Sequence, residues 1–162
     1  MFILTFAVIG LSVFFYLSGM KTTLLFLSVF LSANLFGQNV YIPDANFKAY
    51  LVANPYININ GDTEIQVSEA IAFDGAIDCS NLGIYNLAGH EYFMNLTELN
   101  CSNNPIGFLM FGQNLALEKL YCDNNNLSQL GIWDNTALTT IDCSNNYLTG
   151  LDVSHCSLDT LD

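Results

Sequence analysis

The feature that most constrains this chain is a cysteine that returns every 21 or 22 residues. Cys79, Cys101, Cys122 and Cys143 are separated by 22, 21 and 21 residues. Around the last three, the chain repeats the pattern L-x-x-L-x-C-x-x-N-x-L-x-x-L, with isoleucine at some leucine positions. A coil of this length cannot bury its own apolar side, so it must stack on its neighbours. The period therefore predicts a solenoid.

Apolar and polar residues alternate just before each cysteine, which is strand periodicity. The inward residues two positions before the last three cysteines are Leu99, Leu120 and Ile141. We therefore expect one short strand per coil, joined in a parallel sheet. An asparagine follows each strand where the chain turns away, at Asn104, Asn125 and Asn146. An amide both donates and accepts hydrogen bonds, so these side chains are predicted to form a structural ladder.

This pattern resembles the leucine-rich repeat, with cysteine in the third apolar position of L-x-x-L-x-L-x-x-N-x-L. It is similar to secreted bacterial surface proteins of the internalin-like kind, over residues 74–162. The resemblance implies a solenoid with a parallel sheet on one side, irregular or turn segments on the other, and an N-terminal helical cap. The first copy departs from the pattern, with Asp74 for the leading leucine and Leu82 for the asparagine. No capping unit follows Asp162, so an N-terminal fragment is predicted, lacking further repeats and a C-terminal anchoring region.

Residues 1–37 form a separate apolar segment whose one charge is Lys21. From Met20 the chain reads as a secretory signal peptide with cleavage after Gly37, which makes residues 1–19 a start-site extension. The alternative is a membrane span over residues 2–18, at the lower limit of length for crossing a bilayer.

Residues 38–73 are predicted to form the helical cap. Asp44 is a candidate N-cap for a helix over residues 45–53, which Asn54-Pro55 would end, and a second helix could begin at Val67. The loop between them resembles an EF-hand calcium loop. Its candidate metal ligands are Asn58, Asn60, Asp62, Glu64 and Glu69. The match is imperfect, because Thr63 stands where glycine is expected. With a single loop and few charges the predicted site is weak and structural, and the alternative is a polar loop without an ion.

The cysteine spacing gives no local zinc motif. Stacked cysteines that all point into an apolar core are poorly placed for disulfides, so free buried thiols are favoured over disulfides and metal. Cys156 is out of register and could pair with a cysteine beyond the chain; a dyad with His155 lacks an orienting partner. His90 is predicted to be a surface residue. No nucleophile motif or phosphate loop occurs, and the chain is predicted not to be an enzyme.

The charge balance of residues 38–162 is 2 − 15 = −13, from two lysines and all fifteen acidic residues. Nucleic acid is excluded as a partner, since phosphate binding needs basic patches. The predicted binding surface is the outward, concave face of the sheet, which would recognise an extracellular protein or glycan. Its residues are Glu98, Asn100, Ser102, Lys119, Tyr121, Asp123, Thr140, Asp142 and Ser144.

Three alternatives stay open at this point. The sheet face could be merely solvated. A lateral patch could form from Phe108, Met110 and Trp133 on the return side, unless these residues pack between coils. The chain could also be a structural spacer that displays other domains of a longer secreted protein. We expect a secreted or cell-surface location, with membrane contact only through an uncleaved N-terminal segment or a missing C-terminal region.

Overall fold

The computed structural model describes residues 37–162. The predicted signal peptide and the alternative membrane span thus lie outside the described residues, apart from Gly37. Within residues 37–162, no helix has both the length and the apolar character needed to cross a bilayer.

Two helices precede the repeats. Helix α2 (Ala45–Ala53) begins at Asp44, whose Oδ1 accepts hydrogen bonds from the backbone N–H groups of Asn46 and Phe47 at 3.0 and 3.1 Å. The predicted cap is therefore confirmed, and the helix buries Phe47 and Leu51. Helix α3 (Val67–Ala72) follows the candidate calcium loop. The other oxygen of Asp44 accepts from the N–H of Tyr85 at 2.9 Å, which joins α2 to the first coil.

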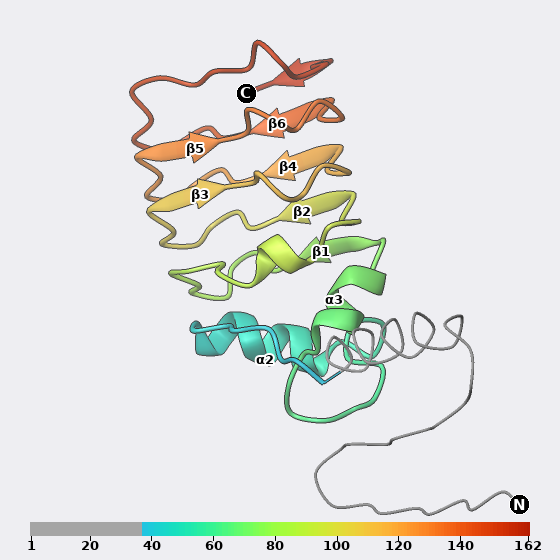
Figure 1. Cartoon of the computed structure of the whole chain (residues 1–162). Helices are drawn as coiled ribbons and strands as arrows, with labels where there is room; N and C mark the ends of the chain where they lie inside the picture. The colour runs from blue at the N-terminus through green and yellow to red at the C-terminus, as the bar shows by residue number, and fades with distance from the viewer. Residues whose placement is uncertain (1–36) are drawn as a thin grey trace, which may run out of the picture. The chain divides into compact units, whose positions relative to one another are not determined.

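The main sheet has five parallel strands in the order β1-β2-β4-β6-β7. Figure 1 shows its strands stacked one above the next along one side of the described chain. They are β1 (Ala76–Asp78), β2 (Glu98–Asn100), β4 (Lys119–Tyr121), β6 (Thr140–Asp142) and β7 (Thr160–Leu161). The middle residue of each of the first four strands is buried and its neighbours face outward, as the alternating pattern predicts.

The return side carries a second parallel sheet that the sequence analysis did not anticipate. It pairs β3 (Phe108–Met110) with β5 (Gln129–Gly131), and a short 3-10 helix, η1 (His90–Tyr92), occupies the first coil (Figure 1). Leu109 and Leu130 are buried while Phe108 and Met110 face outward. The segments around Leu109 and Leu130 are therefore strands, although irregular or turn segments were expected on the return side.

The cysteines pack as apolar residues. Cys79, Cys101 and Cys122 are fully buried beside the strand leucines, Cys143 is half-buried, and all are free thiols. No cluster of three or more His, Cys, Asp or Glu residues within 37–162 is arranged to hold a metal. A buried free cysteine acts as a small hydrophobic residue, which agrees with the interpretation favoured from the sequence.

Two asparagines shape the turns that follow β2, β4 and β6, and the turn after β1 has the first of the two alone. The first adopts the left-handed conformation, with φ between 51° and 59°, at Asn81, Asn103, Asn124 and Asn145. This conformation is costly for most residues but is tolerated by Asn. The second asparagine lies on the predicted ladder. Nδ2 of Asn125, for example, donates to the carbonyls of Cys101 and Cys122 at 3.0 and 3.1 Å, and its Oδ1 accepts from Ile106 N at 3.1 Å.

Asn104 and Asn146 repeat this arrangement one coil away on either side. Their Nδ2 groups donate to the carbonyl of the cysteine in their own coil and of the cysteine in the preceding coil. Their Oδ1 atoms each accept from a backbone N–H at 2.9 Å. The three asparagines therefore pair the backbone groups that a tight coil would otherwise leave unsatisfied.

A second asparagine ladder runs along the return side. Nδ2 of Asn114 donates to the carbonyls of His90 and Phe93, and Nδ2 of Asn135 donates to those of Phe111 and Asn114. Cys156 follows at the same 21-residue interval, and its Sγ faces the carbonyl of Ile132 at 3.9 Å. Cys156 is thus out of register with the cysteine series, as predicted, but in register with this second ladder, which was not anticipated.

Candidate functional site

The outward face of the main sheet, called here the sheet face, comprises the outward residues of β2, β4 and β6 and the residues just after them. It contains the nine predicted partner-binding residues, Glu98, Asn100, Ser102, Lys119, Tyr121, Asp123, Thr140, Asp142 and Ser144. The parallel register sets them in rows across the strands, with Glu98 beside Lys119 and Lys119 beside Thr140. The structure thus brings these residues together on adjacent strands.

Several polar groups of the sheet face close turns within the chain. Oδ1 of Asp78, Asn100 and Asp142 each accepts from the N–H two residues later, at 3.2, 3.1 and 3.0 Å. Such short-range bonds are typical of Asx turns. They explain why the last position of these strands is Asp or Asn, a structural reason that the sequence analysis did not identify.

Ser102 is not an open contact residue. Its exposed fraction is 5%, and its Oγ donates to Oδ1 of Asp123 in the next coil. The prediction that Ser102 faces a partner is corrected accordingly, because the neighbouring coil covers its small side chain.

Tyr121 interrupts the series of turn-forming side chains. It pairs in register with Asn100 on one side and Asp142 on the other, but its phenol cannot close an Asx turn. Beside it, Nζ of Lys119 lies 3.3 Å from a carboxylate oxygen of Glu98, and this contact raises the pKa of Lys119. Strand β4 therefore presents an aromatic ring and a cation near the middle of an otherwise small, acidic surface.

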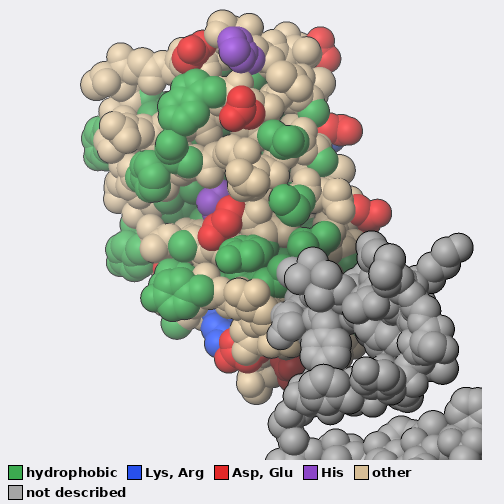
Figure 2. Space-filling view, in the orientation of Figure 1, with side chains coloured by type: hydrophobic (Ala, Val, Ile, Leu, Met, Phe, Trp, Pro, Cys, Tyr) green, Lys and Arg blue, Asp and Glu red, His purple; other side chains and the backbone are tan. Residues whose placement is uncertain are grey.

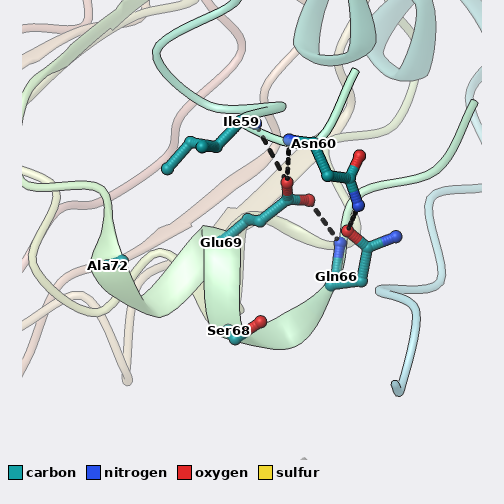
Figure 3. A pocket seen from close by; sticks show the side chains of 6 residues that line it. All are labelled: Ile59, Asn60, Gln66, Ser68, Glu69 and Ala72. Atoms are coloured by element: carbon teal, nitrogen blue, oxygen red, sulfur yellow. Dashed lines mark hydrogen bonds between the residues drawn. The ribbon is translucent and has the colours of Figure 1, made fainter. Parts of the chain in front are cut away.

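The candidate calcium loop is closed by N–H donors. In Figure 3, one carboxylate oxygen of Glu69 accepts from the N–H groups of Ile59 and Asn60, and the other accepts from Gln66 N. The remaining oxygens are similarly engaged: Asn58 Oδ1 by Gly61 N, Asn60 Oδ1 by Asp62 N, and Asp62 Oδ1 by Glu64 N.

Two of the predicted calcium ligands, Glu64 and Asp62, also contact other groups of the protein. Oε1 of Glu64 pairs with Nζ of Lys48 at 2.6 Å, so this predicted ligand is engaged by a cation of the protein itself. The N–H of Glu64 in turn lowers the pKa of Asp62. Calcium takes six to eight oxygen ligands, among them carboxylates, amide carbonyls and waters. The side-chain oxygens of this loop are instead engaged by N–H groups and by Lys48, which disfavours a cage in this arrangement, and calcium binding stays an untested prediction.

His90 lies inside the molecule, against expectation. It is 9% exposed, and its Nδ1 and Nε2 lie 2.9 and 3.0 Å from the carbonyl oxygens of Leu87 and Met110. The imidazole therefore links the first coil to β3, and its ring packs edge-on to Phe111 with centroids 5.1 Å apart. The 21-residue period does mark this position, because His90 precedes Phe111 and Phe111 precedes the buried Ile132 by 21 residues each. Its polar residue type led to the prediction of a surface position.

The comparisons with known proteins agree with this geometry. The Leucine Rich Repeat family profile matches residues 95–113 and 137–158. A solved structure of the functional domain of InlJ from Listeria monocytogenes, which includes a cysteine ladder, is 34% identical with a TM-score of 0.66. It aligns with 74% of this chain and 26% of its own length.

This chain has an internalin-like leucine-rich repeat fold. An internalin, InlF, also from Listeria monocytogenes, matches with a TM-score of 0.64 at 17% identity, which supports the fold alone. That match covers 75% of this chain and 36% of InlF, so this chain spans about a quarter to a third of the two proteins. No curated protein matches the sequence. The predicted fold class is confirmed, and the cysteine ladder named for InlJ has a counterpart in Cys79, Cys101, Cys122 and Cys143.

Proposed function

We propose that this chain is a non-enzymatic recognition module that binds an extracellular protein or glycan through its sheet face. The observation that carries the proposal is Tyr121, which occupies a turn-forming position without forming the turn. Aromatic residues near the centre of a surface dominate many binding energies. The neighbouring Lys119 and Thr140 add hydrogen-bonding groups on adjacent strands.

A secreted or cell-surface location forms part of the same proposal. It is supported by the internalin-like fold and by the acidic balance of residues 38–162, which favours neither nucleic acid nor an anionic membrane surface. Fractionation of cells that express the full chain, with detection in medium, envelope and cytoplasm, tests it. Recovery from the cytoplasm alone would contradict the location.

The binding proposal is tested by probing a glycan array and a panel of purified extracellular proteins with the immobilised chain. Each positive probe is then measured with Tyr121→Ser and with Tyr147→Ser. Tyr147 is a matched control because it is exposed and lies outside the sheet-face rows. We expect Tyr121→Ser to weaken the dissociation constant at least about tenfold, the effect of losing a central aromatic contact, and Tyr147→Ser to leave it unchanged. Equal affinity of both variants would overturn the proposal.

One observation favours a second function, that of a structural spacer. Many polar side chains of the sheet face already form hydrogen bonds within the chain, in the Asx turns and between Ser102 and Asp123. A spacer would bind no probe on either panel, yet would keep its full thermal stability. That combination separates this function from a binding module.

A further inference from the structure

A second surface lies on the return side, away from the sheet face. Its core, called here the lateral patch, comprises Phe108, Met110 and Trp133, which are 58%, 39% and 51% exposed. Figure 2 shows hydrophobic side chains gathered over the side that carries β3 and β5 in Figure 1, with acidic side chains between them. These residues therefore do not pack away between coils, which was the alternative left open by the sequence.

The lateral patch is held in place by Gly131. A Cβ atom at this position would lie 3.1 Å from both Sδ of Met110 and Cη2 of the Trp133 ring. The thioether and the indole thus both rest against the glycine backbone, at a distance that any larger residue would disturb. Both side chains therefore pack over Gly131, and a side chain at this position would displace them.

A cleft opens beside the lateral patch. Its volume is about 190 Å³, and it is lined from β3 by residues 108–110 and from the first coil by residues 86–88, His90 and Glu91. His90 closes it from below through its contacts with the carbonyls of Leu87 and Met110. Typical small-molecule sites are larger, about 300–1,000 Å³, so this cleft suits a single side chain.

The charged groups around the cleft indicate which kind of side chain it would accept. Glu91 lines it; its Oε2 accepts from Gly89 N at 2.8 Å, and no hydrogen bond within residues 37–162 uses its Oε1. The two lysines of residues 37–162 are both held in ion pairs, Lys48 with Glu64 and Lys119 with Glu98. Glu91 therefore has no partner among the described lysines, and the nearest potential cation is the His90 ring, whose Nδ1 lies 3.5 Å from Oε2 and closer to the Leu87 carbonyl. Oε1 remains open to a ligand, and the ring of Phe108 can receive a cation on its face.

We propose that the lateral patch and its cleft bind a basic segment of a partner protein. An arginine or lysine side chain enters the cleft, its stem against Met110 and its charge between Glu91 and the Phe108 ring. A neighbouring aliphatic side chain of the segment rests on Trp133. This site is separate from the sheet face, so it goes beyond the function proposed above.

Trp133 is the single tryptophan of the chain, so its fluorescence reports on this site alone. The probe is a synthetic eight-residue peptide of alternating arginine and leucine with blocked termini, titrated against the full chain under selective tryptophan excitation. We expect a saturable change in emission that weakens as salt is raised. The same peptide with citrulline in place of arginine keeps the shape without the charge and should bind about tenfold more weakly.

Three variants complete the test. Glu91→Gln keeps the bond to Gly89 but removes the charge, and Gly131→Ala displaces Met110 and Trp133; each should weaken binding about five- to tenfold. Glu118→Gln removes an equivalent exposed charge elsewhere and should change nothing. Far-ultraviolet dichroism melts verify that each variant is folded.

The proposal is overturned by any of three results. The emission could fail to saturate, the citrulline peptide could bind as tightly as the arginine peptide, or Glu118→Gln could weaken binding as much as Glu91→Gln. Emission that changes with protein concentration in the absence of peptide would instead assign the patch to a second copy of this chain. Loss of binding in Tyr121→Ser would place the peptide on the sheet face, whereas the lateral site predicts unchanged binding there.

Discussion

At the scale of single residues, asparagine does more of the structural work than cysteine. One asparagine of each turn takes the left-handed conformation, and after β2, β4 and β6 the next one donates to carbonyls of two successive coils. The two roles rest on different properties, tolerance of positive φ in the first case and a bifunctional amide in the second. The cysteine, although chemically more conspicuous, contributes burial.

The second asparagine ladder gives a prediction for Cys156→Asn. An amide at this position should donate to the carbonyls of Ile132 and Asn135, as Asn135 does to the preceding coil. We expect the free energy of unfolding to rise by about 1 kcal/mol, the usual net value of a hydrogen bond, as measured by urea denaturation.

Two matched variants give that prediction its control. Cys156→Ala removes the thiol without adding a donor, and Cys156→Ser adds a shorter one. If the asparagine variant is no more stable than the alanine variant, the ladder does not extend to this coil.

The buried thiols give a prediction about pH. Burial raises the pKa of Cys79 to about 12 and raises the pKa values of Cys101 and Cys122 as well. A thiol in the unfolded chain titrates near pH 8.5, so the folded state binds more protons above that value and its stability falls as the pH rises. From Cys79 alone, the loss by about pH 10 should be on the order of 2 kcal/mol, measured as a shift of the urea midpoint.

The comparison variant is Cys79→Ala, whose stability should decline less steeply over the same pH range. An alkaline decline that is identical with and without Cys79 would contradict the assignment.

Alkylation gives a separate test of thiol burial. At about pH 8, the reagent should modify the half-buried Cys143 and Cys156 of the native protein first, because access and thiolate character control the reaction.

At the scale of elements, the loop between α2 and α3 gives the clearest conflict between a motif and its setting. The spacing of Asn58, Asn60, Asp62 and Glu69 matches a calcium loop, yet each contributes an oxygen to an N–H donor of the loop or of α3. The same side-chain oxygens that would coordinate an ion can also accept hydrogen bonds from backbone N–H groups. Sequence spacing alone does not distinguish these two uses.

Calcium titration of this loop is the third prediction. A cation would have to displace the N–H groups of Ile59 and Asn60 from Glu69, so we expect the same melting temperature in millimolar calcium and in chelator. Differential scanning calorimetry makes the measurement. A calcium-dependent rise that disappears in Glu69→Gln would instead establish the site, since that variant keeps an acceptor oxygen but loses the charge.

At the scale of the whole molecule, the coils couple mainly to their nearest neighbours. Each main-sheet strand receives backbone hydrogen bonds from adjacent coils, such as Cys101 N to Tyr121 O at 2.8 Å and Cys122 N to Asp142 O at 2.8 Å. Stability in such a stack is approximately a sum of coil and interface contributions. The two long sides also differ, one polar around Tyr121 and one apolar around Trp133.

Leu120→Ala tests this coupling, because Leu120 is fully buried in β4 between two strands. We expect a loss of about 3 kcal/mol in unfolding free energy, within the usual range for a buried leucine. Hydrogen exchange should accelerate most at Cys101 and Cys122, whose N–H groups bond to the next coil, and least in α2. Uniform acceleration that includes Lys48 of α2 would show that the cap and coils unfold as one unit.

Much of the fold could be predicted because the repeat leaves few alternatives. The alternation around Leu99, Leu120 and Ile141 specifies which side chains are inside, and Asp44 specifies where α2 begins. These are local signals, and stacking at a fixed period carries them through the solenoid. The second sheet was missed because the outward residues of β3, Phe108 and Met110, are as apolar as the inward Leu109, so no alternation of polar and apolar residues marks the strand.

The sequence by itself thus determined the solenoid, the inward cysteines and the asparagine positions, because each depends on periodicity within one coil. Only the tertiary structure decided the burial of Ser102, the contacts of His90 with two carbonyls, and the engagement of Glu64 with Lys48. Each of these depends on a contact between segments that are far apart in the chain or in neighbouring coils. A side chain acquires its surroundings only when those segments meet, so its availability for a partner or an ion cannot be obtained from spacing alone.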